Sequence, residues 1–132
     1  MLFRSVVAFL ASHAAVEKIL YPENPDHPDH ALAKRLLPKG CGAVFSFDIR
    51  GGREAGRRFI ESLRVFSHLA NIGDAKSLVI HPATTTHYRM SDEDLKKAGI
   101  GPGTIRLSIG LEDPEDLVQD LERSLAAAAK AR

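Results

Sequence analysis

The sequence predicts an α+β fold in which a small, mostly antiparallel sheet carries helices packed on one side. Some segments have alternating apolar and polar residues, which is typical of strands. In the segments between them, apolar residues recur every three or four positions, which is typical of helices. The predicted strands are few and short, and several have one polar face. A doubly wound parallel sheet would instead show strands that are apolar on both faces. The length of 132 residues fits one domain.

The first half of the chain contains an amphipathic N-terminal segment followed by two predicted strands and two further helices. The apolar positions of the N-terminal segment lie on one side of a helix and are Phe3, Val6, Val7, Leu10 and Ala14. A signal peptide is the alternative, but the apolar run is short and breaks without a clear processing pattern. The next elements are a strand over 16–21, a helix over 30–37, a strand over 43–49 and a helix over 53–63.

The second half is predicted to hold two strands and two helices. A short apolar strand over 77–81 precedes a helix that begins after a serine cap at Ser91 and ends at Gly99. The strand over 104–109 alternates, with Ile105 and its apolar neighbours on one face and Arg106 on the other. Asp113 then caps a long C-terminal helix that has proline at its first position.

Composition excludes several classes of function. The formal net charge is +1 and the charges are interspersed, so a nucleic-acid partner is not expected. Cys41 is the only cysteine, which rules out an internal disulfide and a multi-cysteine zinc site and fits a cytoplasmic location. No stretch approaches the ~18 apolar residues of a membrane span.

Two polar residues are candidates for substrate binding. A guanidinium on the polar face of a strand, as at Arg106, offers two parallel N–H donors that match a carboxylate. The plainer interpretation of Arg106 is a solvated strand arginine. Asn71 opens an Asn-Ile-Gly-Asp turn and is most simply a turn former.

Other residues with suitable chemistry lack a suitable setting. Lys76 could bind an aldehyde cofactor, but its polar surroundings offer no desolvated pocket, so we interpret it as solvated. His27 and His30, three apart across a proline, make a weak metal site, and no metal is expected. His81 and His87 bracket a Thr-rich loop without a nucleophile in a recognisable setting.

The runs LANIGDAKSLVIHPATTTH (69–87) and TIRLSIGLED (104–113) together resemble the C-terminal domain of the Cys/Met-metabolism family of pyridoxal-phosphate enzymes. Within that family, the motif NIGDAKSL is most similar to the O-acetylhomoserine sulfhydrylase branch (O-acetylhomoserine aminocarboxypropyltransferases). The resemblance implies that Arg106 binds the α-carboxylate of an amino-acid substrate. It also implies, more weakly, that Asn71 lies at the substrate and cofactor site. The family's cofactor lysine lies in a large domain outside this chain, so the resemblance implies no catalytic and no cofactor-binding residue here.

We therefore expect residues 1–15 to be part of an inter-domain linker helix and residues 16–132 to be the C-terminal small domain. The resemblance implies a parent transferase that uses pyridoxal phosphate in homocysteine and methionine synthesis, and a chain that is inactive alone. Its expected partners are the pyridoxal-phosphate-binding large domain, on the same or a separate chain, and the amino-acid substrate. Self-association is also expected, because Phe3, Val7 and Leu10 would be left incompletely buried. The alternatives are a stand-alone binding or regulatory domain, an inert remnant, and a domain of a cystathionine synthase or lyase or of a methionine lyase.

Overall fold

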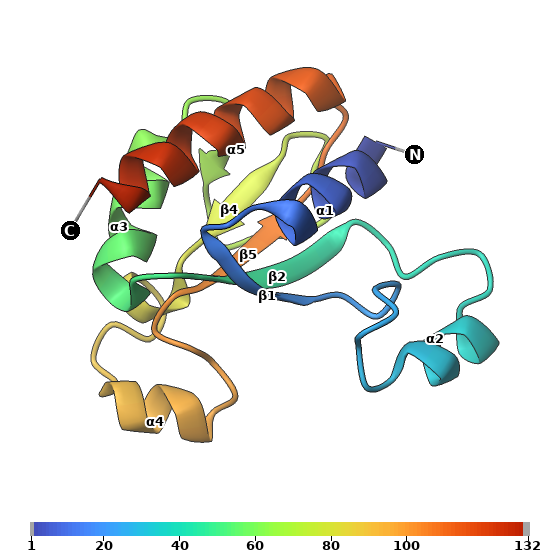
Figure 1. The fold of residues 1–132 in the computed structure, drawn as a ribbon, viewed down its shortest axis with the longest axis horizontal. Coiled ribbons are helices and arrows are strands. Elements are labelled where there is room, and N and C mark those ends of the chain that lie inside the picture. The colour runs from blue at the N-terminus through green and yellow to red at the C-terminus, as the bar shows by residue number, and fades with distance from the viewer. Residues whose placement is uncertain (1, 131–132) are drawn as a thin grey trace.

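The computed structural model describes residues 2–130 and confirms the predicted fold class (Figure 1). Five strands form one sheet in the order β1-β2-β5-β4-β3, and every neighbouring pair is antiparallel except β3 with β4. The strands are β1 (Val16–Leu20), β2 (Val44–Ile49), β3 (Ser67–His68), β4 (Leu78–Ile80) and β5 (Thr104–Ser108). The helices are α1 (Leu2–Ser12), α2 (His30–Leu36), α3 (Gly52–Ser62), the 3-10 turn η1 (Pro82–Thr84), α4 (Asp92–Lys97) and α5 (Pro114–Ala129).

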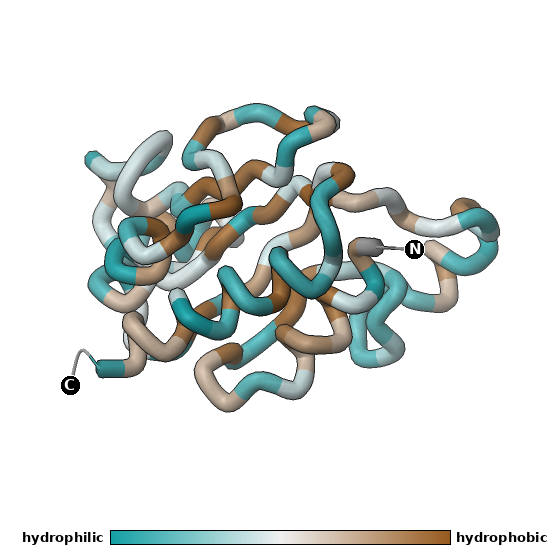
Figure 2. The backbone as a smooth tube through the Cα atoms, turned by 90° about the horizontal axis from the view of Figure 1, so that it is seen from above, coloured by the Kyte–Doolittle hydropathy of each residue, from teal (hydrophilic) through white to brown (hydrophobic). Residues whose placement is uncertain are grey.

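Three helices cover one face of the sheet. Figure 1 shows α1, α3 and α5 together on one side, whereas α2 and α4 lie away from this layer. Figure 2 looks down on this side of the molecule, where hydrophilic and hydrophobic residues alternate along the chain, as expected for helices with one buried face. The other face of the sheet is not covered by these three helices, and it carries the polar residues of the strands.

The core lies between the sheet and the three helices. On β2, Phe45, Phe47 and Ile49 are buried, and the ring of Phe47 meets Phe59 of α3 edge-on with centroids 5.7 Å apart. The apolar stripe of α5 is also buried and consists of Leu117, Leu121, Leu125 and Ala128. Burying each large apolar side chain stabilises the fold by about 1.5–3 kcal/mol.

One prediction about α1 was wrong. We expected Leu10 to remain incompletely buried, but Leu10 and Val6 are fully buried because α1 packs against both α5 and β1. Phe3 and Val7 are half-buried, and the ring of Phe3 lies 6.1 Å from that of Tyr21. Self-association stays a prediction that must rest on other exposed apolar side chains: Leu32, Leu36, Leu37, Leu69, Ile72, Tyr88 and Leu111.

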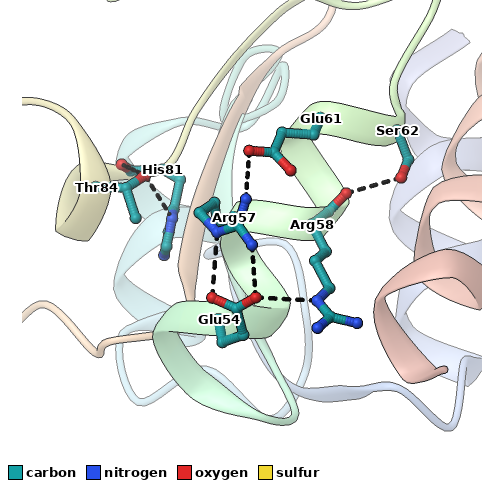
Figure 3. Close-up of polar contacts among 7 residues, drawn as sticks. All are labelled: Glu54, Arg57, Arg58, Glu61, Ser62, His81 and Thr84. Carbon is teal, nitrogen blue, oxygen red and sulfur yellow. Dashed lines mark hydrogen bonds and ion pairs between the residues drawn. The ribbon is translucent and has the colours of Figure 1, made fainter. Parts of the chain in front are cut away.

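The predicted helix ends and surface pairs are largely confirmed. The Ser91 hydroxyl accepts a hydrogen bond from the Asp94 backbone N–H, and Asp113 caps α5 through the Glu115 N–H at 2.8 Å. On α3 the pairs Glu54–Arg58 and Arg57–Glu61 form as their spacing predicts (Figure 3). Hydrogen bonds from Arg57 and then Arg58 lower the pKa of the Glu54 carboxyl to about 2. Within residues 2–130 no helix has the length and apolarity needed to cross a membrane.

Asp120 is a buried carboxylate that the sequence analysis did not single out. It lies in α5 with 1% of its surface exposed. Its oxygens accept hydrogen bonds from the backbone N–H groups of Arg64, Val65 and Phe66, at 3.0, 2.8 and 3.3 Å, and from Arg123. Asp120 therefore fixes the segment through which the chain passes from α3 into β3.

Candidate functional site

Arg106 lies at the centre of a row of paired residues across the sheet. In the strand register Leu20 of β1 pairs with Ser46 of β2, Ser46 pairs with Arg106 of β5, and Arg106 pairs with Ile80 of β4. Directly paired residues extend their side chains on the same face of a sheet. The alternation of β2 and β5, which buries Phe47 and Leu107 against the helices, therefore directs this row to the opposite face.

The row forms part of the lining of a cavity of about 470 Å³, which we call the Arg106 cavity. Its other lining residues come from η1, from three loops and from β5: Ala70, Pro82, Thr86, His87, Gly99, Ile100 and Thr104. The lining is largely apolar, with a few polar groups. A concave site of this size and composition is typical of small-molecule binding.

The guanidinium of Arg106 has few hydrogen-bond acceptors near it within residues 2–130. Its Nη2 donates to the carbonyl oxygen of Asn71 at 3.5 Å, which is at the outer limit of a hydrogen bond. Across residues 2–130, no carboxylate lies within 4 Å of Arg106. A half-buried cation with free donors in a concave, largely apolar site provides the chemistry for binding an anionic group with two oxygens, such as a carboxylate.

The loop that contains Asn71 lies beside Arg106, so the structure brings the two predicted site residues together. The Asn71 side-chain oxygen accepts a hydrogen bond from the Ile72 N–H at 2.9 Å, as expected of a turn former. The loop is tied to β5 because the Gly73 N–H donates to the Ser108 hydroxyl at 3.1 Å. Asn71 thus reaches Arg106 through its backbone, while its side-chain oxygen is used by the turn.

His81 and His87 have separate positions in the structure. His81 is fully buried, and its Nε2 donates to the Pro102 carbonyl at 2.8 Å. Because a carbonyl only accepts, this bond fixes the tautomer, and Nδ1 then accepts from the Thr84 hydroxyl at 2.9 Å (Figure 3). Burial lowers the pKa of His81, so the ring stays neutral and structural. His87 instead lines the Arg106 cavity.

The residues that the sequence analysis set aside show no site in the part of the chain that the structure describes. Lys76 is exposed, as is every other lysine. His30 contacts the Pro22 carbonyl at 2.8 Å, and His27 accepts from the Asp29 N–H at 3.1 Å. Among residues 2–130, no three His, Cys, Asp or Glu side chains gather as metal ligands would. Cys41 is half-buried and packs against the core.

Comparison with known proteins gives close matches over almost the whole chain. The family described as Cys/Met metabolism PLP-dependent enzyme matches residues 4–126. The chain is 46% identical to an O-succinylhomoserine sulfhydrylase of Pseudomonas aeruginosa over 93% of its own length and 30% of that protein. It is 45% identical to O-acetyl-L-homoserine sulfhydrylase 1 of Thermus thermophilus, over 89% of the chain and 28% of that protein.

The fold matches solved structures equally well. A cystathionine gamma synthase from Xanthomonas oryzae pv. oryzae, solved in complex with cystathionine, superposes with a TM-score of 0.88. It is 40% identical, and the match covers 99% of this chain and 34% of that one. The chain thus spans about 30% of the length of the curated relatives it matches.

Proposed function

Because the chain belongs to the family of Cys/Met metabolism PLP-dependent enzymes, we propose that residues 16–132 are the C-terminal, substrate-carboxylate-binding domain of a cytoplasmic sulfhydrylase. Residues 1–15 would belong to the helix that links this domain to the pyridoxal-phosphate-binding large domain, on the same or a separate chain. The proposed reaction replaces the acyloxy group of O-acetylhomoserine by sulfide or a thiol, giving homocysteine or methionine.

The observation that supports this proposal is the free guanidinium of Arg106 in a cavity of the sheet face. A substrate carboxylate placed there would take up the two N–H donors that the protein leaves almost unused. Each hydrogen bond to a charged group contributes about 1.5–3 kcal/mol. By holding one end of the amino acid, Arg106 would orient the rest of the molecule toward the reacting groups. The backbone of Asn71 borders the same guanidinium and would contribute to this site.

The residues of this chain do not fit covalent attachment of pyridoxal phosphate. A lysine that binds an aldehyde cofactor needs a lowered pKa, which comes from a desolvated setting. Every lysine here is exposed, from Lys18 to Lys130. The cofactor, which stores carbanion charge when bound, would therefore be held by the large domain, and this chain would supply the carboxylate contact.

Sulfhydrylases among the relatives are 38% to 46% identical to this chain, and the sister enzymes lie inside this range, so sequence identity does not separate the reactions. The two sulfhydrylases are 46% and 45% identical to this chain. An L-methionine gamma-lyase of Fusobacterium nucleatum is 42% identical, and the cystathionine gamma synthase is 40% identical. These two reactions are the alternatives to be assayed alongside.

A domain exchange tests the proposal. Residues 16–132 would replace the matching segment of the Pseudomonas aeruginosa sulfhydrylase. We expect a folded, cofactor-loaded chimera that forms homocysteine from an O-acylhomoserine and sulfide, whereas this chain alone does not. A chimera that binds the cofactor but turns over neither O-acylhomoserines nor methionine nor cystathionine would contradict the proposal and favour a binding domain or an inert remnant.

The exposed position of Lys76 leads to a prediction about the isolated chain. Incubation with pyridoxal phosphate followed by borohydride should leave no stoichiometric covalent adduct on Lys76, because this exposed side chain has no desolvated pocket around its amine. Mass spectrometry of the digested chain measures this, with the exposed Lys97 as an internal reference for background labelling. Stoichiometric labelling of Lys76 alone would overturn the assignment of the cofactor to another domain.

A further inference from the structure

Arg53, at the start of α3, forms hydrogen bonds and an ion pair with the segment from η1 to α4. The guanidinium of Arg53 donates to the carbonyl oxygen of Ala83 and, at 3.1 Å, to that of Met90. It also pairs with the Asp92 carboxylate at 2.8 Å. One side chain therefore joins the two ends of the stretch between Ala83 and Met90.

A second fastening holds the beginning of the same segment. The buried ring of His81 lies against Gly56 of α3, where an added Cβ would come within 2.4 Å of Nε2. That nitrogen donates to Pro102, and the Thr85 hydroxyl donates to the His81 carbonyl at 2.8 Å. The end of β4 is thus held against α3 by His81, independently of Arg53.

The stretch between the two ends is part of the wall of the Arg106 cavity. Thr86 and His87 both line the cavity and contact each other at 2.8 Å, between the Thr86 hydroxyl and His87 Nδ1. In the described chain, the other hydrogen bonds of residues 85–90 stay within residues 81–91. Arg53 is therefore the long-range polar anchor of this wall.

We propose that Arg53 is a positioning residue for the Arg106 cavity. By holding the two ends of the loop 83–90 together, it places Thr86 and His87 in the cavity wall. An arginine suits this task, since its planar fork donates to several acceptors at once. A lysine ammonium keeps the charge but cannot reproduce the fork, so it should hold the loop only in part. The effect on substrate binding rests on the proposed function, whereas the closing of the loop does not.

The first test measures loop closure in the full chain. Arg89 is exposed inside the loop, so trypsin cleavage after Arg89, followed by mass spectrometry, reports opening. The variants are Arg53→Ala and Arg53→Lys. The matched control is Arg57→Ala, one turn along the same helix, which removes an arginine whose ion pairs, within residues 2–130, are with Glu54 and Glu61 of α3. We expect cleavage after Arg89 to be about tenfold faster in Arg53→Ala, less accelerated in Arg53→Lys, and unchanged in the control.

The melting temperature and the rate of cleavage at sites outside the loop distinguish global destabilisation from local opening of the loop. If Arg53→Ala accelerates cleavage at all sites equally, or does not fold, the same comparison is made with Arg53→Lys, which keeps the charge. Unchanged cleavage after Arg89, or acceleration that is uniform in both variants, would overturn the inference.

The second test measures the cavity itself. The Nε–Hε signal of Arg106 in an NMR spectrum is followed while O-acetylhomoserine is added. We expect the dissociation constant to rise about 3–10-fold in Arg53→Ala and to be partly restored in Arg53→Lys, with the control unchanged. An opened loop with unchanged affinity would overturn the positioning role. If the wild-type signal does not respond at all, the proposed function fails, whereas the proteolysis result still decides whether Arg53 closes the loop.

Discussion

An Arg106→Ala variant of the chimeric enzyme is expected to lose about 10–100-fold or more in kcat/KM for O-acetylhomoserine. The variant lacks the charge-assisted, two-pronged contact to the substrate carboxylate, and hydrogen bonds to charged groups contribute about 1.5–3 kcal/mol each. Steady-state kinetics measures the loss. Arg106→Lys should recover only part of it, because an ammonium does not provide the planar fork.

The melting temperature distinguishes this role from a structural one. The Arg106 side chain donates a single hydrogen bond, of 3.5 Å, within the described chain, so truncating it should change the melting temperature little. Arg64→Ala, at an exposed arginine that does not line the cavity, is the control and should keep full efficiency. Unchanged efficiency in Arg106→Ala would make the residue a solvated strand arginine, and a collapsed melting temperature would make it structural.

Replacing Asp120 by alanine is expected to produce the largest loss of stability, about 3–5 kcal/mol in the free energy of unfolding. The variant would leave the N–H groups of Arg64, Val65 and Phe66 without their acceptor in a partly buried setting. Urea denaturation of the chain measures the change.

Asp116 provides the control for that measurement. It lies one turn earlier on α5 and is exposed, so Asp116→Ala should cost about 1 kcal/mol or less. Asp120→Asn keeps one oxygen as an acceptor, so its loss in the free energy of unfolding should lie between those of Asp120→Ala and Asp116→Ala. Equal losses in Asp120→Ala and Asp116→Ala would show that the buried carboxylate does not hold the 64–66 segment.

The elements that the sequence predicted well are those whose pattern is local. Apolar and polar residues alternate along β5, and burial alternates along β2, which is why the core face of Phe47 and Leu107 and the opposite direction of Arg106 could be predicted. The caps at Ser91 and Asp113 were predicted because a cap and its N–H partner lie within one turn. The strand β3, with only two residues, is too short to give a periodic signal.

What could not be predicted depends on contacts between distant segments. The burial of Leu10 depends on α5 covering α1, and the fixed tautomer of His81 depends on Pro102. The burial of Asp120 could be predicted, since an acidic residue three positions after Leu117 lies on the buried side of the helix. Its role as acceptor for residues 64–66 could not be inferred, because these backbone N–H groups lie more than fifty positions away in the chain.

Binding of a substrate carboxylate by Arg106 can be measured by titrating the chain with two ligands that differ only in that group. The Arg106 Nε–Hε signal would be followed during addition of O-acetylhomoserine and, separately, of its α-methyl ester. If Arg106 binds the carboxylate, its signal should show a saturable shift with the acid and none with the ester, while other arginine signals such as that of Arg57 stay unchanged. No shift with either ligand, or the same shift with both, would contradict this binding.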